Sequence, residues 1–185
     1  MHNTSIGNLF LIEQNSYQDS RGHFLKFFNQ KEFKEANLVT EFKEVFVSVS
    51  KLYTIRGMHF QLPPYNEVKI VTVLKGVILD VVLDLRKDSP TYHKFEKFNL
   101  SGDAPFSLYV GKGLAHGFLS LDENSMICYL TSELYNEECN SGIQWNSFGF
   151  DWNVKVPIIS QRDRALPCLN EFESPFSLEY SYGES

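Results

Sequence analysis

The sequence predicts an all-β protein, a jelly-roll barrel or sandwich with short peripheral helices. Segments rich in β-branched and aromatic residues recur at intervals of about ten residues from residue 41 onward, each bounded by Gly, Pro, Asp or Asn. Only residues 31–37 have the composition of a helix, and that stretch is short. No repeat or linker divides the 185 residues, so we expect one domain over residues 1–185.

The expected elements follow one another along most of the chain. A first strand is expected at residues 7–12 and an extended segment at 23–28. After the helix, strands are expected at residues 45–50, 68–74, 77–85, 95–100, 106–110, 117–121 and 125–131. Segments 68–74 and 77–85 meet at Lys75 and Gly76, which predicts a hairpin. The strand pattern weakens after Asn146, and residues 170–185 are expected to form a C-terminal extension on the surface or on a partner.

Charge and cysteine content exclude several classes of protein. The net charge of -6 argues against binding to nucleic acid or to an anionic membrane. The three cysteines, Cys128, Cys139 and Cys168, lack the spacing of a zinc site or a disulfide framework, so we expect reduced thiols. No apolar run approaches the roughly 18 residues of a membrane span, and no signal peptide is evident. These features predict a cytoplasmic protein.

One strand carries two carboxylates on a single face. Because side chains alternate along a strand, Ile78, Asp80, Val82 and Asp84 share one face of segment 77–85. Both carboxylates could face solvent. Alternatively, one of them lines the mouth of the barrel and orients a His or a Lys.

The sequence contains only part of a metal-binding pattern. Small β-barrels bind metal through two His and a Glu on one strand pair, with a further His later in the chain. Here His59 is followed by Phe60 and Gln61, so the second His of the pair is missing, and only His116 and Glu67 remain. We therefore expect no metal.

The stretch Arg56-Gly57-Met58-His59-Phe60-Gln61, with Lys69 beyond it, places an imidazole between two cations. That combination suits a base held beside an anion. Such a base needs an orienting carboxylate and a cation or donor for the anion that forms. Tyr129 or Tyr135 could supply the acid. A His with a purely structural role is the alternative.

Motifs along residues 7–170 resemble those of the dTDP-4-dehydrorhamnose 3,5-epimerase family. The resemblance rests on Arg56 to Gln61 with Pro64 and Lys69, Gly76 with Asp80 to Arg86 and Ser89-Pro90-Thr91, Gly113 to Phe118, Tyr129, Ser132 and Tyr135, Gly142-Ile143 with Trp145-Asn146, and Ser160 with Asp163. Ser132 stands where the family usually has Thr. The resemblance implies a cupin-type jelly-roll homodimer whose N-terminal strands cross between subunits.

The resemblance also implies a reaction without metal or cofactor on a nucleotide-linked 4-keto-6-deoxy sugar. His59, paired with Asp163, would be the base at C3 and C5. Lys69, with help from Arg56 and His116, would hold the enolate oxygen. Tyr129 would return a proton on the other face, which favours inversion at both centres. The substrate- and nucleotide-binding residues implied are Arg21, Phe24, Lys26, Glu44, Phe46, Ser48, Arg56, Gln61, His116, Tyr135 and Trp145.

The segments implied to hold the nucleotide depart from the family pattern. Lys26 replaces an acid, and Glu44, Phe46 and Tyr53 replace a Gln, an Asn and a Gly. An ionised Glu only accepts hydrogen bonds and Phe makes none, whereas an amide does both. A carboxylate suits the N–H donors of guanine, so the sequence predicts a GDP-linked 4-keto-6-deoxy-hexose or -heptose of capsule biosynthesis.

Four alternatives remain open. The enzyme could act on dTDP-4-dehydro-6-deoxyglucose in the dTDP-rhamnose pathway. It could invert C3 alone, or it could be a 3,4-ketoisomerase of the same fold. It could also be a non-catalytic sugar-binding module, although a binder has no need of His59, Asp163, Lys69 and Tyr129 together.

Overall fold

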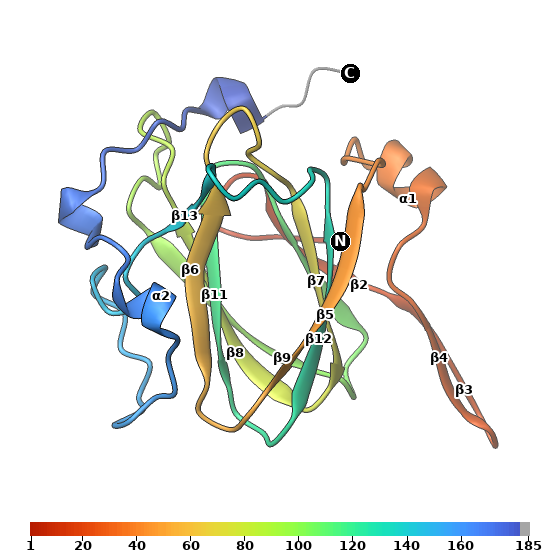
Figure 1. The fold of residues 1–185 in the computed structure, drawn as a ribbon. Coiled ribbons are helices and arrows are strands. Elements are labelled where there is room, and N and C mark those ends of the chain that lie inside the picture. Colours follow the sequence, from red (N-terminus) through yellow and green to blue (C-terminus); the bar gives the residue numbers. More distant parts are fainter. Residues whose placement is uncertain (182–185) are drawn as a thin grey trace.

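Two antiparallel β-sheets face each other in the computed structural model, which describes residues 1–181 (Figure 1). The larger sheet has the strand order β1 (His2–Asn3), β2 (Leu9–Glu13), β10 (Phe106–Val110), β7 (Lys69–Lys75), β12 (Ser125–Thr131), β5 (Glu44–Ser50). The smaller sheet has the order β13 (Asn140–Gly142), β6 (Ile55–Gln61), β11 (Leu114–Ser120), β8 (Val77–Asp84), β9 (Phe95–Ser101). The all-β prediction is confirmed.

The remaining elements lie outside the sandwich. Strands β3 (Asn15–Asp19) and β4 (Gly22–Lys26) pair only with each other and form a hairpin that extends away from the sheets (Figure 1). The helices are the short peripheral ones expected: α1 (Gln30–Glu35), α2 (Gln161–Arg164) and the 3-10 helices η1 (Leu169–Glu171) and η2 (Leu178–Ser181). The Asn29 side chain caps α1 by accepting a hydrogen bond from the Lys31 amide.

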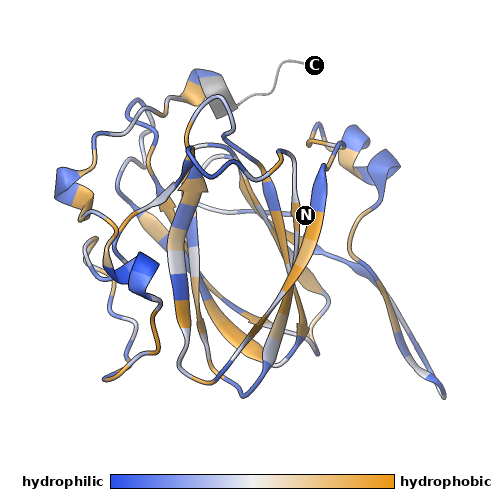
Figure 2. Ribbon diagram, viewed as in Figure 1, coloured by the Kyte–Doolittle hydropathy of each residue, from blue (hydrophilic) through white to orange (hydrophobic). Residues whose placement is uncertain are grey.

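Three apolar clusters hold these layers together. The first, which includes Val71, Val82 and Phe118, lies between the two sheets. The second packs the chain beyond β13 against the outer face of the smaller sheet, and the third packs the segment around α1 against the outer face of the larger one. Figure 2 shows the corresponding hydrophobic stretches along the strands. A strand that is covered on both faces has a continuous run of apolar residues, which is why the sequence predicts strands at residues 68–74 and 77–85.

The hairpin predicted at Lys75 and Gly76 is wrong. Strand β7 pairs with β10 and β12 in the larger sheet, whereas β8 pairs with β9 and β11 in the smaller one. Gly76 has a φ of 80°, and a Cβ there would lie 2.7 Å from Ser125 Oγ. The glycine therefore lets the chain turn a corner between sheets. A hairpin turn and such a corner leave the same local pattern in a sequence.

Several boundaries also differ from the predicted ones. The strand expected at 117–121 begins at Leu114, and the segment expected at 23–28 ends at Lys26. Strand β3 was not predicted because its polar residues are exposed and show no apolar alternation. Strand β13 and helix α2 are too short for any periodicity to reveal them.

Two glycines bring β6 and β11 unusually close together. Gly57 has a φ of 139°, and a Cβ on it would overlap Gly117 of the neighbouring strand. The ladder between the strands shifts register here, beyond the pair that His59 and His116 form. The glycines of the two motifs thus set the position of the two histidines.

The part of the predicted extension that is described packs on this chain's own smaller sheet. The Ser174 hydroxyl donates to the Leu85 carbonyl, and the Lys87 amide donates to the Phe176 carbonyl at 3.1 Å. Phe176 is buried in the second apolar cluster. Residues 182–185 of the extension lie outside the described residues. Within the described part, no helix is long and apolar enough to cross a membrane.

Candidate active site

Two histidines face the interior of the sandwich side by side. His59 on β6 and His116 on β11 are directly paired across the smaller sheet. The Asp163 carboxylate lies 2.8 Å from His59 Nε2. Helix α2 carries Asp163, and Ser160 caps that helix by accepting a hydrogen bond from the Asp163 amide at 3.0 Å. The short helix, invisible in the sequence pattern, is therefore what delivers the carboxylate to the histidine.

Burial keeps the His59 imidazole in its basic form. Desolvation lowers the pKa of His59 below its ordinary value of 6.5, although the hydrogen bond to Asp163 and its charge oppose this shift. The positive charges of Lys69 and Arg162 lower the pKa further. The pKa of Asp163 is itself held below its ordinary value: burial raises it, but hydrogen bonds from His59, Gly57 and Ser160 outweigh that effect. The pair is thus a neutral imidazole beside a carboxylate.

The second histidine has a carboxylate of its own. Asp80 Oδ2 lies 2.7 Å from His116 Nε2, and both residues are buried. The sequence left open whether a carboxylate of β8 faces solvent or orients a His or a Lys. Asp80 faces inward and orients a histidine. Asp84 is also buried, but it binds Arg86, Ser89 and Thr91 instead. Neither carboxylate faces solvent.

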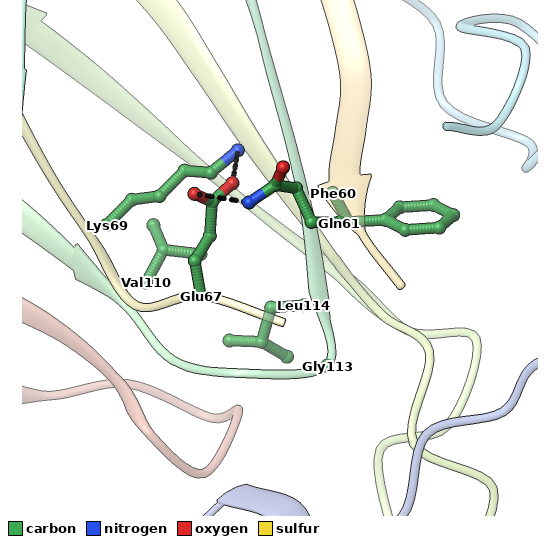
Figure 3. A pocket seen from close by; sticks show the side chains of 7 residues that line it. All are labelled: Phe60, Gln61, Glu67, Lys69, Val110, Gly113 and Leu114. Carbon is green, nitrogen blue, oxygen red and sulfur yellow. Dashed lines mark hydrogen bonds and ion pairs between the residues drawn. The ribbon is translucent and has the colours of Figure 1, made fainter. Parts of the chain in front are cut away.

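Lys69 is held by a carboxylate that the sequence suggested only as a metal ligand. Its Nζ lies 3.0 Å from Glu67 Oε1, and Gln61 Nε2 donates to the other Glu67 oxygen at 3.3 Å. Figure 3 shows Glu67 between these two side chains in a small pocket, with Phe60 pointing away. The Gln61 amide also accepts a hydrogen bond from the Asn136 amide at 2.7 Å. Gln61, expected at the substrate, is therefore bound within the chain.

Tyr129 completes the cluster from the opposite sheet. It is 6% exposed and lies edge-on to His116, with ring centroids 6.2 Å apart. Burial raises the pKa of Tyr129 well above its ordinary value of 10.0, and the nearby Ser48 side chain only partly opposes this. The phenol therefore keeps its proton throughout the neutral range. The Arg56 charge also acts on Tyr129, and Arg56 Nε donates to Ser50 Oγ at 3.0 Å.

Other expected site residues lie on the β3–β4 hairpin, on the outer face of the smaller sheet and at the exit of β12. Arg21, Phe24 and Lys26 sit on the hairpin that extends from the sandwich, where Arg21 pairs with Asp19. Trp145 packs on the outer face of the smaller sheet, away from the side where His116 and Asp80 lie. Tyr135 is 59% exposed at the exit of β12. The hairpin residues thus lie apart from His59 within a single chain (Figure 1), whereas the Tyr135 hydroxyl accepts a hydrogen bond at 3.1 Å from Asn140 on β13, the strand that pairs with β6.

The two substitutions behind the guanine hypothesis have partners within the chain. One Glu44 oxygen accepts the Tyr135 amide at 3.0 Å, and the Phe46 ring stacks on Tyr129. Tyr53, aligned with the family's Gly, has a φ of 63°, a left-handed conformation that favours glycine. The alignment of this segment is therefore sound, and the role of Glu44 and Phe46 toward a nucleotide base stays a prediction.

The described residues contain no group of three or more His, Cys, Asp or Glu side chains arranged to hold a metal ion. His59 and His116 each approach one carboxylate. The arrangement suits proton transfer instead. It combines a neutral imidazole, a lysine, a second histidine and a protonated phenol around the same interior space.

Comparison with known proteins agrees with this chemistry. The model of the dTDP-4-dehydrorhamnose 3,5-epimerase family matches residues 3–171. An enzyme of that name from Methanothermobacter thermautotrophicus is 37% identical over 173 residues, which cover 91% of this chain and 93% of the relative. The chain belongs to this family. It is therefore an enzyme of the isomerase class, as the motifs predicted.

Solved structures of the epimerase family share the whole architecture. A dTDP-4-dehydrorhamnose 3,5-epimerase from Bacillus anthracis, with TDP and PPi bound, superposes with a TM-score of 0.87 at 38% identity, covering 90% of this chain and 97% of that one. A 3'-monoepimerase from Streptomyces bikiniensis in complex with dTDP-quinovose has a TM-score of 0.87 at 29% identity, covering 92% and 88%. The cupin-type fold is thus confirmed. The names of these relatives give a thymidine nucleotide and lend no support to the GDP hypothesis.

Proposed function

We propose that this chain epimerises a dTDP-linked 4-keto-6-deoxy sugar at C3 and C5. This is the first of the four alternatives given above, an enzyme of the dTDP-rhamnose pathway. The observation that carries the proposal is the His59–Asp163 pair at 2.8 Å, with the pKa of His59 lowered. Asp163 holds one ring nitrogen, which leaves the other with a lone pair. A ketone at C4 acidifies the neighbouring C–H bonds, so a neutral imidazole is base enough.

The other residues of the cluster take the remaining roles. His59 removes the proton from C3 or C5, and the negative charge moves to the oxygen at C4. Lys69, with Arg56 and His116, stabilises that oxygen by charge and hydrogen bonding. Tyr129 gives its proton to the opposite face of the carbon, which inverts the centre. His59 then releases the proton it removed to solvent, and Tyr129 regains one from solvent. The reaction changes no oxidation state.

The nucleotide follows from two lines of support. Relatives whose names include dTDP cover nearly all of this chain. Glu44 and Phe46, which suggested guanine, are engaged with Tyr135 and Tyr129. Arg21, Phe24 and Lys26 reach a nucleotide only if their hairpin crosses to another subunit, so a homodimer with exchanged hairpins is part of the proposal. A cytoplasmic location stays a prediction.

Deuterium incorporation in D₂O, followed by NMR, tests this function. The enzyme is incubated separately with a dTDP-linked and a GDP-linked 4-keto-6-deoxy sugar. We expect exchange at C3 and C5 of the dTDP sugar, and loss of exchange in His59→Asn with dTDP affinity retained. Exchange with the GDP sugar alone would overturn the nucleotide assignment. Strong residual exchange in His59→Asn would overturn the assignment of the base.

Inversion at C3 alone is the second candidate. The observation that favours it is the likeness to a 3'-monoepimerase, which covers 92% of this chain. The match of residues 3–171 to the model of a 3,5-epimerase family favours two centres instead. The same NMR experiment separates the two, because a single-centre enzyme would leave the C5 proton in place.

A further inference from the structure

Phe46 and Tyr129 are direct partners across the ladder between β5 and β12. Directly paired residues of an antiparallel ladder point to the same face of the sheet. Tyr129 belongs to the apolar cluster between the two sheets, so Phe46 also points inward. The neighbouring residue Val47 pairs with Cys128 and points to the outer face.

The two rings are stacked. Their centroids lie 4.9 Å apart with an angle of 19° between the planes. Tyr129 is 6% exposed whereas Phe46 is 47% exposed. Strand β5 ends the larger sheet, so Phe46 covers one face of the phenol at the open side of the sandwich. The ring thereby lies between the phenol and solvent.

His116 contacts Tyr129 from another direction, edge-on at 6.2 Å. The phenol is therefore confined between an aromatic ring on its face and an imidazole that Asp80 fixes. Rotation of the Tyr129 ring out of this position would lose the stacking contact and expose the ring. Proton return depends on the position of the hydroxyl, and that position is set by these two rings together with the Ser48 side chain beside the hydroxyl.

We propose that Phe46 is a positioning residue for Tyr129 and governs how often proton removal ends in inversion. This inference rests on the proposed function and goes beyond it, because Phe46 was expected to contact the nucleotide base. A held phenol protonates the enolate on the face opposite His59 and inverts the carbon. A displaced phenol leaves His59 to return the proton to the face from which it came, so the carbon exchanges its hydrogen but keeps its configuration.

The measurement is the number of inversions per exchange event, taken by NMR in D₂O with the dTDP-linked 4-keto-6-deoxy sugar. We expect Phe46→Ala to lower this ratio by about threefold to tenfold, the range that corresponds to an aromatic stacking contact. Phe46→Tyr should restore it, because the ring remains. Phe95→Ala removes a partly exposed ring that packs edge-on against Phe148 and Phe150, away from the site. It is the matched control and should leave the ratio unchanged.

A double-mutant cycle shows whether Phe46 acts through Tyr129. In the Tyr129→Phe background, Phe46→Ala should have no further effect on the inversion ratio. The affinity for dTDP should be the same with Phe or Ala at position 46. A weaker dTDP affinity that persists in the Tyr129→Phe background, with an unchanged inversion ratio, would overturn the inference and return Phe46 to the nucleotide.

The two proposals fail in different ways. Absence of any exchange in the wild-type enzyme would remove the proposed function. Normal exchange in the wild type, with an equal inversion ratio in Phe46→Ala, would remove only the role of Phe46. A Phe46→Ala protein with a lowered rate but an unchanged ratio would also overturn the inference, because general loosening of the fold reduces exchange and inversion alike.

Discussion

His59 and His116 are neighbours of the same type with the same kind of partner, yet only one is suited to act as the base. The His59 side chain is 26% exposed and the His116 side chain 6%. Asp163 reaches His59 from a separate helix, whereas Asp80 reaches His116 from the adjacent strand. A histidine with an open face can take a proton, and one enclosed on all sides can orient and donate.

Replacing Asp163 with Asn tests the pairing at this residue. The amide keeps the shape but removes the charge that favours the correct tautomer of His59. We expect kcat for C–H exchange to fall by about 10²–10⁴-fold with little change in dTDP affinity. Steady-state kinetics and calorimetric titration with dTDP measure the two effects. Full activity in the Asp163→Asn variant would show that the carboxylate does not serve the base.

The pH dependence follows from the lowered pKa of His59. The base must be neutral, so activity is lost as pH falls through the His59 pKa, which burial holds below 6.5. We therefore expect kcat/KM to be flat around neutral pH and to decline only below 6.5 on the acid side. Initial rates across this range provide the measurement. An acid limb centred above 6.5 would contradict the assignment.

At the scale of elements, the strands were predictable but their connections were not. Apolar runs such as residues 77–85 identify a buried strand because both of its faces are covered. The path of the chain at Gly76 depends on whether the next strand finds its partner in the same sheet, and that is a long-range property. For the same reason the sequence indicated His59, Lys69 and Tyr129 as chemical groups, but the stacking of Phe46 on Tyr129 depends on a register that only the folded sheet defines.

The close approach of β6 and β11 makes Gly57 the most sensitive position of the site's framework. A Cβ there would overlap the Gly117 backbone, and φ is 139°. We expect Gly57→Ala to reduce the free energy of unfolding by more than about 1 kcal/mol and to abolish exchange. Gly7, whose Cβ would meet nothing within 4 Å, provides the control as Gly7→Ala. Chemical denaturation measures the change, and equal stability of the two variants would contradict the packing argument.

At the scale of the whole molecule, two features of a single chain have no partner within the described residues. Strand β5 pairs only with β12 and leaves Val45, Val47 and Val49 at least 49% exposed. Apolar residues on an open sheet edge favour pairing with another chain. The β3–β4 hairpin, which carries Arg21 and Phe24, extends away from the sandwich (Figure 1). In the proposed homodimer, a second copy would cover the edge and receive the hairpin.

Mixing two inactive variants tests this arrangement. Arg21→Ala damages the hairpin, and His59→Asn damages the base. If each hairpin completes the site of the other subunit, a heterodimer of the two variants contains one site with both residues intact. Random reassociation then restores about one quarter of wild-type exchange, because half of the dimers are mixed and each has one working site. Each variant alone should stay nearly inactive.

A hairpin that completes the site of its own chain gives the opposite result. If the hairpin serves its own chain, a mixed dimer pairs a chain lacking Arg21 with a chain lacking His59, and neither site is complete. Mixing would then give no more exchange than the two variants measured separately. Sedimentation of the mixture establishes that heterodimers are present, so that failure to restore exchange reflects the path of the hairpin and not a lack of assembly.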